Sequence, residues 1–194
     1  IVLPRVIRTY YQEPTSAHDE LRDTYTSCRS VRPSHGRDAE GFRIFHILPG
    51  MMDDRLAKTS TYALAVAIFI DKQFDRDSRE KVTLCIDIRA GRGWRNLHAL
   101  KLIPFMKESL GLLFGLFPER LHKCVLYPFP PAFWYLWKMM SKCIDAKSRR
   151  TIVIVTGKCK INAEPPTAQL VAQLGAEAAP LLEDYRTSKF KAYY

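Results

Sequence analysis

The chain has 194 residues, of which 47% are hydrophobic and 11% aromatic, and its 30 basic against 20 acidic side chains give a formal net charge of +10. This length and composition indicate one folded domain with a sizeable core, and they exclude an intrinsically disordered chain. The longest apolar runs, 62–70 and 110–117, are much shorter than the roughly 20 residues that a membrane-spanning helix needs.

The cysteines indicate the redox compartment of the protein, and the first residue indicates whether the chain is a fragment. The five cysteines are odd in number, show no C-x-x-C spacing and lie mostly within apolar runs. We therefore expect reduced core residues in a cytoplasmic protein rather than a disulfide framework or a zinc site. Because the chain begins with Ile1 rather than Met, we interpret it as a fragment or a trimmed chain.

The start of the chain differs from the rest. Residues 1–40 are polar and contain helix and strand breakers, among them Pro33 and Gly36. They predict at most one helix, over residues 17–30, with Ser16 as its N-cap. The predicted organisation is therefore a polar N-terminal segment, 1–40, followed by a single domain over residues 41–194.

From Gly41 onward, apolar runs alternate with helical patterns. Strands are expected over residues 42–48, 82–88, 123–127 and 151–155. Helices are expected over residues 62–74, 96–117, 132–144 and 167–185, with interruptions at Pro104, Gly175 and Pro180. Because the strands are apolar on both faces and alternate with helices, the sequence predicts an α/β fold with a mainly parallel sheet covered by helices.

Motifs for catalysis and cofactor binding are absent or incomplete. There is no G-x-S-x-G or H-E-x-x-H, and neither Gly157-Lys158 nor Gly91-Arg92-Gly93 continues as a phosphate loop or a dinucleotide turn would. The five histidines show no metal-ligand spacing. We therefore predict that the protein is not an enzyme and holds no metal or cofactor.

Asp87 lies near the end of a buried strand, the edge at which open α/β sheets place their ligands. It could be catalytic, but we favour a structural carboxylate that is hydrogen-bonded to a loop or to a helix N-terminus.

The excess positive charge is concentrated in two stretches. Residues 120–160 hold nine basic side chains and one acid, Asp145, and residues 89–107 hold five basic side chains and no acid. Patches of this kind favour an anionic partner, such as nucleic acid, an anionic membrane or a phosphorylated ligand. A solvated face of a basic protein would show the same pattern.

Residues 127–140 are unusually rich in large apolar side chains. These fourteen residues contain two each of Trp, Tyr, Phe and Met, and three prolines precede the expected helix at Ala132. Such a helix is either buried on all sides, or it lines a ligand cavity with one face and touches a membrane interface with the other. The basic residues around it favour the second interpretation, because anionic lipid attracts them.

Several motifs follow one another along the chain. They are the strand 82–87 with its late acid, Phe117-Pro118-Glu119-Arg120-Leu121, the pattern Pro130-x-x-Phe133-x-x-x-Trp137, and Ile144-Asp145 followed by a strand. These motifs resemble those of the CRAL-TRIO lipid-binding domains, a family that includes phosphatidylinositol transfer proteins. The resemblance implies an apolar lipid pocket closed by a mobile gate helix, here residues 132–144. Glu119 matches the glutamate that the inositol-lipid binders use, whereas Thr151 stands at the position of their lysine.

The resemblance and the charge pattern together predict a non-enzymatic protein that binds, transfers or senses a phospholipid or other lipophile and docks peripherally on anionic membrane. The alternative is a protein-interaction adaptor, for a small GTPase or another partner, whose pocket is filled by side chains. Nucleic-acid binding is disfavoured, because the aromatic residues are not interleaved with basic ones. The expected lipid-binding residues are Ile86, Ile88, Glu119, Val125, Tyr127, Phe133, Trp134, Trp137, Met140 and Ile144. The expected headgroup or membrane contacts are Lys138, Lys142, Arg149 and Arg150.

Overall fold

The computed structural model describes residues 31–73, 78–91, 96–97, 99–117, 119–161 and 163–191. The helix predicted over residues 17–30 lies outside these residues.

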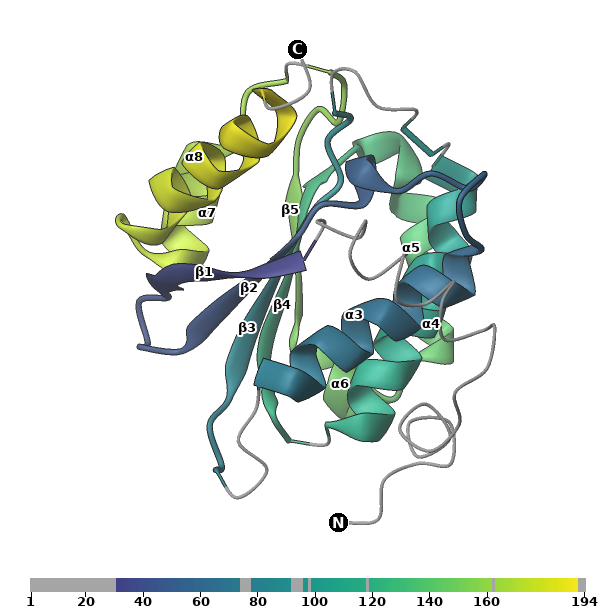
Figure 1. Ribbon diagram of the computed structural model, residues 1–194, viewed down its shortest axis with the longest axis horizontal. Helices are drawn as coiled ribbons and strands as arrows, with labels where there is room; N and C mark the ends of the chain where they lie inside the picture. Colours follow the sequence, from purple (N-terminus) through teal and green to yellow (C-terminus); the bar gives the residue numbers. More distant parts are fainter. Residues whose placement is uncertain are drawn as a thin grey trace.

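Five strands form one sheet in the order β1-β2-β3-β4-β5 (Figure 1). Strand β1 is antiparallel to β2, and the other neighbouring pairs are parallel. The predicted α/β fold with a mainly parallel sheet is therefore confirmed. The strands are β1 (Val31–Arg37), β2 (Arg43–Ile47), β3 (Val82–Asp87), β4 (Leu121–Phe129) and β5 (Ile152–Thr156).

Helices cover both faces of this sheet (Figure 1). On one side lie α3 (Thr59–Gln73), α4 (Ala99–Leu116), α5 (Trp134–Met140) and α6 (Ala146–Arg150). Three short 3-10 helices are η1 (Pro49–Met51), η2 (Pro131–Phe133) and η3 (Ser141–Cys143). On the other side lie α7 (Thr167–Leu174) and α8 (Ala178–Lys191).

The sheet separates two apolar clusters. Along β3 and β4, alternate residues point to opposite faces, so Leu84 and Leu126 pack with α3 and α4, whereas Cys85 and Val125 pack with α7 and α8. All six residues of β3 are buried, since both faces are covered. This arrangement explains why the sequence of β3 is mostly apolar on both faces.

Strand β1 was not expected from the sequence, which predicted at most one helix in residues 1–40. Pro33 and Gly36 are poor strand formers, and the pairing of β1 with β2 is irregular between Pro33 and Arg37. An edge strand tolerates a proline, because one side of the strand has no hydrogen-bonding neighbour. The breakers therefore mark an irregular edge strand rather than a loop.

Three helices also differ from the prediction. Helix α4 continues through Pro104, where an interruption was expected. Helix α8 contains Pro180 in its first turn, where the missing N–H costs little, and α8 ends at Lys191. Gly175, with a φ of 94°, separates α7 from α8 as predicted. The single helix expected over 132–144 is instead η2, α5 and η3 in succession.

Candidate functional site

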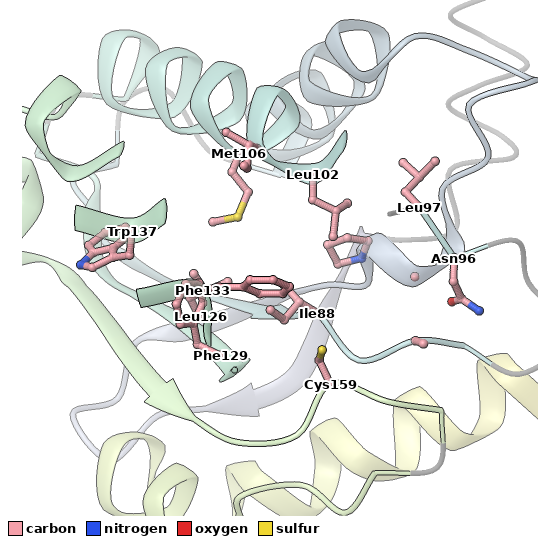
Figure 2. A pocket seen from close by; sticks show the side chains of 14 residues that line it. Ile88, Asn96, Leu97, Leu102, Met106, Leu126, Phe129, Phe133, Trp137 and Cys159 are labelled. Carbon is pink, nitrogen blue, oxygen red and sulfur yellow. The ribbon is translucent and has the colours of Figure 1, made fainter. Parts of the chain in front are cut away.

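A cavity of about 300 Å³ lies at the carboxyl ends of β3 and β4, under helix α4 (Figure 2). Open α/β sheets bind their ligands at this edge. Ile88, Leu126 and Phe129 line it from the sheet side, and Leu102, Ile103 and Met106 line it from α4. The remaining lining residues are Pro49, Gly50, Ala90, Asn96, Leu97, Phe133, Trp137 and Cys159.

The described residues that line this cavity are almost all apolar, and none of them carries a charge. Its one amide, Asn96, accepts a hydrogen bond from the Gly91 N–H at 2.5 Å and donates one to the Gly91 carbonyl at 2.7 Å. The backbone N–H of Ala90 donates a hydrogen bond to the Cys159 carbonyl at 3.0 Å. This bond joins the loop that contains Cys159 to the loop that follows β3. Burial raises the pKa of the Cys159 thiol, so this group is neutral at physiological pH.

Residues 131–144 contribute Phe133 and Trp137 to the wall of the cavity, and we call this stretch segment 131–144. Phe133 and Trp137 are four residues apart, one helical turn, and both face the cavity (Figure 2). Phe133 also meets Phe129 edge to face, with ring centroids 6.4 Å apart. Three other side chains of the segment point to solvent, since Trp134, Tyr135 and Met139 are 53%, 75% and 52% exposed. Segment 131–144 therefore has one apolar face on the cavity and another on solvent.

The structure brings some of the expected lipid-binding residues together at the cavity. Ile88, Phe133 and Trp137 line it. Ile86 and Ile144 pack in the apolar cluster on the same side of the sheet. Trp134 lies on the exposed side of segment 131–144, and the side chain of Met140 lies outside the described part of the structure.

Three of the expected lipid-binding residues do not line the cavity, contrary to the prediction. They are Val125, Tyr127 and Glu119. Val125 and Tyr127 belong to the cluster under α7 and α8, because alternate residues of β4 face opposite sides of the sheet. The Tyr127 hydroxyl is 3.0 Å from Nε2 of buried His46. Glu119 is exposed, and its carboxylate accepts a hydrogen bond from Lys147 Nζ at 2.8 Å, which lowers the pKa of Glu119.

The expected membrane contacts are all at the surface. Lys138 and Lys142 lie on segment 131–144, and Arg149 and Arg150 lie on α6. All four are exposed, and Arg149 Nη2 donates to the Ile144 carbonyl at 3.0 Å. Asp145, the one acid of this stretch, caps α6 by accepting from the Ser148 N–H at 2.9 Å. The Ser148 hydroxyl and this N–H together lower the pKa of Asp145.

Asp87 is hydrogen-bonded to the loop that follows β3, as favoured from the sequence. Its carboxylate accepts from the backbone N–H and the guanidinium of Arg89, with Nη2 at 2.6 Å. Arg89 Nη2 lies 2.5 Å from Glu183 on α8, and Arg186 Nε lies 3.2 Å from Asp87. Burial opposes the charge on Arg89, but the hydrogen bonds to Asp87 and Glu183 outweigh it and raise the pKa of Arg89. This network joins α8 to the loop that carries Ile88 and Ala90.

Sequence reasoning missed the part of the cavity that α4 and the loops supply. Leu102 and Met106 are four residues apart, one helical turn, and this spacing could have indicated an apolar face. Pro49 begins η1, whereas Leu97 and Cys159 lie in two separate loops, and no sequence pattern relates these three residues. Among the described residues, no group of three or more His, Cys, Asp and Glu side chains could hold a metal ion.

The sequence match decides the family. Residues 30–175 match the family described as CRAL/TRIO domain. The chain belongs to the CRAL/TRIO domain family. CRAL/TRIO domains are generally lipid-binding and lipid-transfer domains rather than enzymes, and they take lipophilic ligands such as phospholipids. The resemblance inferred from the sequence motifs is thereby confirmed.

The fold of this CRAL/TRIO domain is also similar to a solved structure. It matches the crystal structure of Sfh5 with a TM-score of 0.52 and 16% sequence identity, over 76% of this chain and 54% of that chain. The chain therefore spans about half the length of that protein. No curated protein matches the sequence. No helix in the described part of this CRAL/TRIO domain has the length and hydropathy of a membrane span.

Proposed function

We propose that the chain binds one lipid or small lipophile in the cavity under segment 131–144 and carries or senses it without catalysing a reaction. The observation that supports this proposal is the cavity itself, whose described lining is apolar and which is bordered by a short surface helix. An apolar ligand gains about 0.8 kcal/mol for each CH₂ group it transfers from water into such a site.

Segment 131–144 is the part of the wall best suited to act as a gate. Helix α5 has only seven residues and is flanked by two 3-10 turns, so it has few backbone hydrogen bonds to lose. An outward displacement of this segment would carry Phe133 and Trp137 away from the cavity and open a path for the ligand. This movement corresponds to the gate predicted from the family resemblance.

The outer face of segment 131–144 is suited to an anionic membrane surface. Trp134, Tyr135 and Met139 are exposed apolar side chains, and Lys138 and Lys142 lie among them. Aromatic residues beside basic ones favour the membrane interface, where each basic side chain near anionic lipid contributes about 1 kcal/mol. We therefore propose that docking of this face and opening of the gate occur together.

The alternative function, a protein-interaction adaptor, predicts a pocket filled by side chains. The cavity of about 300 Å³ favours lipid binding over this alternative. The exposed aromatic residues of α5 fit either a membrane or a protein partner, so the cavity is the feature that discriminates between the two functions.

Lipid co-purification tests the proposal. Mass spectrometry of extracts from the purified chain should find a lipophile at up to one molecule per chain. Trp137→Ala should reduce its amount several-fold, because a cavity wall is lost. Tyr135→Ala is the matched control, since this side chain is on the same helix but is 75% exposed. Absence of any co-purifying or exchangeable lipophile, with both variants like the wild type, would overturn the proposal.

A further inference from the structure

We infer that the outer edge of strand β5 binds an extended acidic segment of another protein, which pairs with β5 and adds a strand to the sheet. This inference goes beyond the proposed function, because it concerns the edge of the sheet and not the cavity. It is supported by the open edge, by the residues of β5 and by the charges at the two ends of the strand.

Strand β5 is the last strand of the sheet and lies next to β4 (Figure 1). Ile152 and Ile154 pack with the apolar cluster on the α3 and α4 side, and Val153 packs with the cluster on the α7 and α8 side. All three are nevertheless only partly buried, whereas every residue of β3, in the middle of the sheet, is buried. Because both faces of β5 are covered, the exposure that remains lies at its outer edge.

The hydrogen bonds to β4 show which backbone groups of β5 face this edge. The Thr151 carbonyl accepts from the Cys124 N–H at 2.8 Å. The Gly157 N–H donates to the Phe129 carbonyl at 3.1 Å. Along a strand, the N–H and C=O of one residue point to one side and those of the next residue to the other side. Ile154 is three positions from both Thr151 and Gly157, so its N–H and C=O point away from β4, where no backbone group of the described residues bonds to them.

The sequence of β5 lacks the features that keep an edge strand from pairing with another chain. Edge strands are usually protected by charged side chains, proline or bulges. All the residues of β5, Ile152–Thr156, are β-branched, and none is charged, proline or glycine. The extra residue in the pairing of β4 with β5 belongs to β4. The opposite edge strand, β1, contains Pro33 and Gly36 and pairs irregularly. Strand β5 is therefore the edge suited to accept another strand.

Positive charge lies at both ends of β5. Residues 146–160 contain five basic side chains and no acidic one. Lys147 is paired with Glu119 at 2.8 Å. The other four are exposed, and within the described part of the chain none of them forms an ion pair: they are Arg149 and Arg150, just before the strand, and Lys158 and Lys160, just after it. A bound strand with acidic residues at both of its ends therefore meets opposite charge in either direction.

The same charges disfavour a second copy of this chain as the partner. If two β5 strands paired antiparallel, the arginines before one strand would face the lysines after the other. If they paired parallel, arginines would face arginines and lysines would face lysines. Like charges opposite one another suppress association, whereas opposite charges favour it. The charge pattern therefore selects an acidic segment of a different protein.

Fluorescence anisotropy of a labelled peptide, titrated with the full chain in the absence of lipid, tests the inference. The probe is Asp-Asp-Val-Thr-Val-Thr-Val-Asp-Asp, whose strand-forming centre has the length of β5. It should bind saturably, at one site per chain. Two control peptides should bind at least about tenfold more weakly. In one, prolines replace the central Thr-Val-Thr and prevent strand pairing, and in the other, lysines replace the aspartates.

Ile154→Pro tests the backbone edge. It removes an N–H that β4 does not use, and an edge strand tolerates proline at such a position. The variant should bind the probe at least about tenfold more weakly. Ile154→Ala is the matched control, since it shortens the same side chain and keeps the N–H, and its binding should stay within about threefold of the wild type. A melting curve for each variant excludes loss of fold as the cause.

Neutralising the ends of β5 tests the charges. Arg150→Gln, Lys158→Gln and Lys160→Gln together should weaken binding of the probe about tenfold, because each exposed ion pair contributes little by itself. The matched control replaces three exposed lysines elsewhere by Gln and should change binding by less than about twofold. These control residues are Lys58, Lys81 and Lys107.

The possible results separate this inference from its alternatives. Binding that needs both the strand-forming centre and the acidic ends, and that Ile154→Pro removes, supports it. Equal binding of the proline-containing peptide would show that any acidic chain is attracted, and would overturn it. A wild-type dimer in analytical ultracentrifugation that Ile154→Pro makes monomeric would assign the edge to a second copy, and would also overturn it. Failure of the probe to bind overturns it as well and leaves the lipid proposal standing, because lipid co-purification reports on the cavity.

Discussion

Two glycines differ in how much space the backbone around them leaves for a side chain. Gly50 lines the cavity, and a Cβ atom there would lie 2.8 Å from the Arg89 carbonyl and 3.2 Å from the Gly91 nitrogen, which are both backbone atoms. Gly111, in helix α4, has nothing within 4 Å of the same position. The first glycine is therefore required by a close backbone approach and the second is not.

We predict opposite effects on stability for the two alanine variants. Gly50→Ala should lower the free energy of unfolding by about 1–3 kcal/mol, the usual cost of overpacking. Gly111→Ala should raise it by about 0.5–1 kcal/mol, because alanine favours the helix over glycine. Urea denaturation of both variants measures this difference. Equal effects in the two would contradict the close approach at Gly50.

Protonation of His46 should lower the free energy of unfolding at acid pH. His46 is fully buried against Tyr127, and burial lowers its pKa to about 4. Asp87 opposes this shift, while Arg89 and Arg186 add to it. Because the unfolded chain takes up the proton near the ordinary pKa of 6.5, the stabilisation is fully present above about pH 6.5 and is lost as the pH falls to about 4.

The predicted loss in this window is on the order of 3 kcal/mol for His46 alone. Chemical denaturation at a series of pH values measures it, and His46→Phe should remove the corresponding part of the slope. A variant whose stability depends on pH as steeply as that of the wild type between pH 6.5 and 4 would show that another group is responsible.

At the scale of elements, segment 131–144 differs most from an ordinary surface helix. Its inner side chains Phe133 and Trp137 reach the cavity, and its outer side chains Trp134 and Tyr135 are exposed. The sequence indicated this division, because Phe133 and Trp137 stand one helical turn apart. The sequence did not reveal that the segment consists of two 3-10 turns around a short α-helix, since its residues show no break at those points.

The docking proposal predicts which charges matter. Replacing Lys138, Lys142, Arg149 and Arg150 by Gln should weaken binding to anionic vesicles by up to about 1 kcal/mol for each side chain. The control replaces four exposed lysines elsewhere, Lys58, Lys72, Lys81 and Lys107. Vesicle sedimentation at fixed salt compares the two sets. Equal losses would indicate that only net charge matters and would contradict docking through segment 131–144 and α6.

The strands and helices of the fold were largely predictable, because apolar runs such as β3 are buried on both faces. Strand β1 was not predictable, because Pro33 and Gly36 fit only an irregular edge strand.

The cavity was predictable in part. Val125 and Tyr127 were assigned to the wrong face, since the sequence of β4 is apolar at successive positions and does not show which alternate set faces α4.

For the whole molecule, the position of the positive charge informs function more than its sum. The net charge of +10 alone would fit a nucleic-acid-binding protein. In the structure, exposed basic side chains of residues 138–150 accompany the aromatic surface of α5, and none of the described residues that line the cavity is basic. One side of segment 131–144 therefore suits an anionic surface, while its other side faces the apolar cavity.

The central claim is that the space between the sheet and segment 131–144 holds a lipophile. Electron density in a crystal of the chain, grown with its co-purified lipid, tests it most directly. We predict continuous density against Met106, Phe133 and Trp137. A cavity closed by the side chains of segment 131–144, with no space for a ligand, would contradict the account.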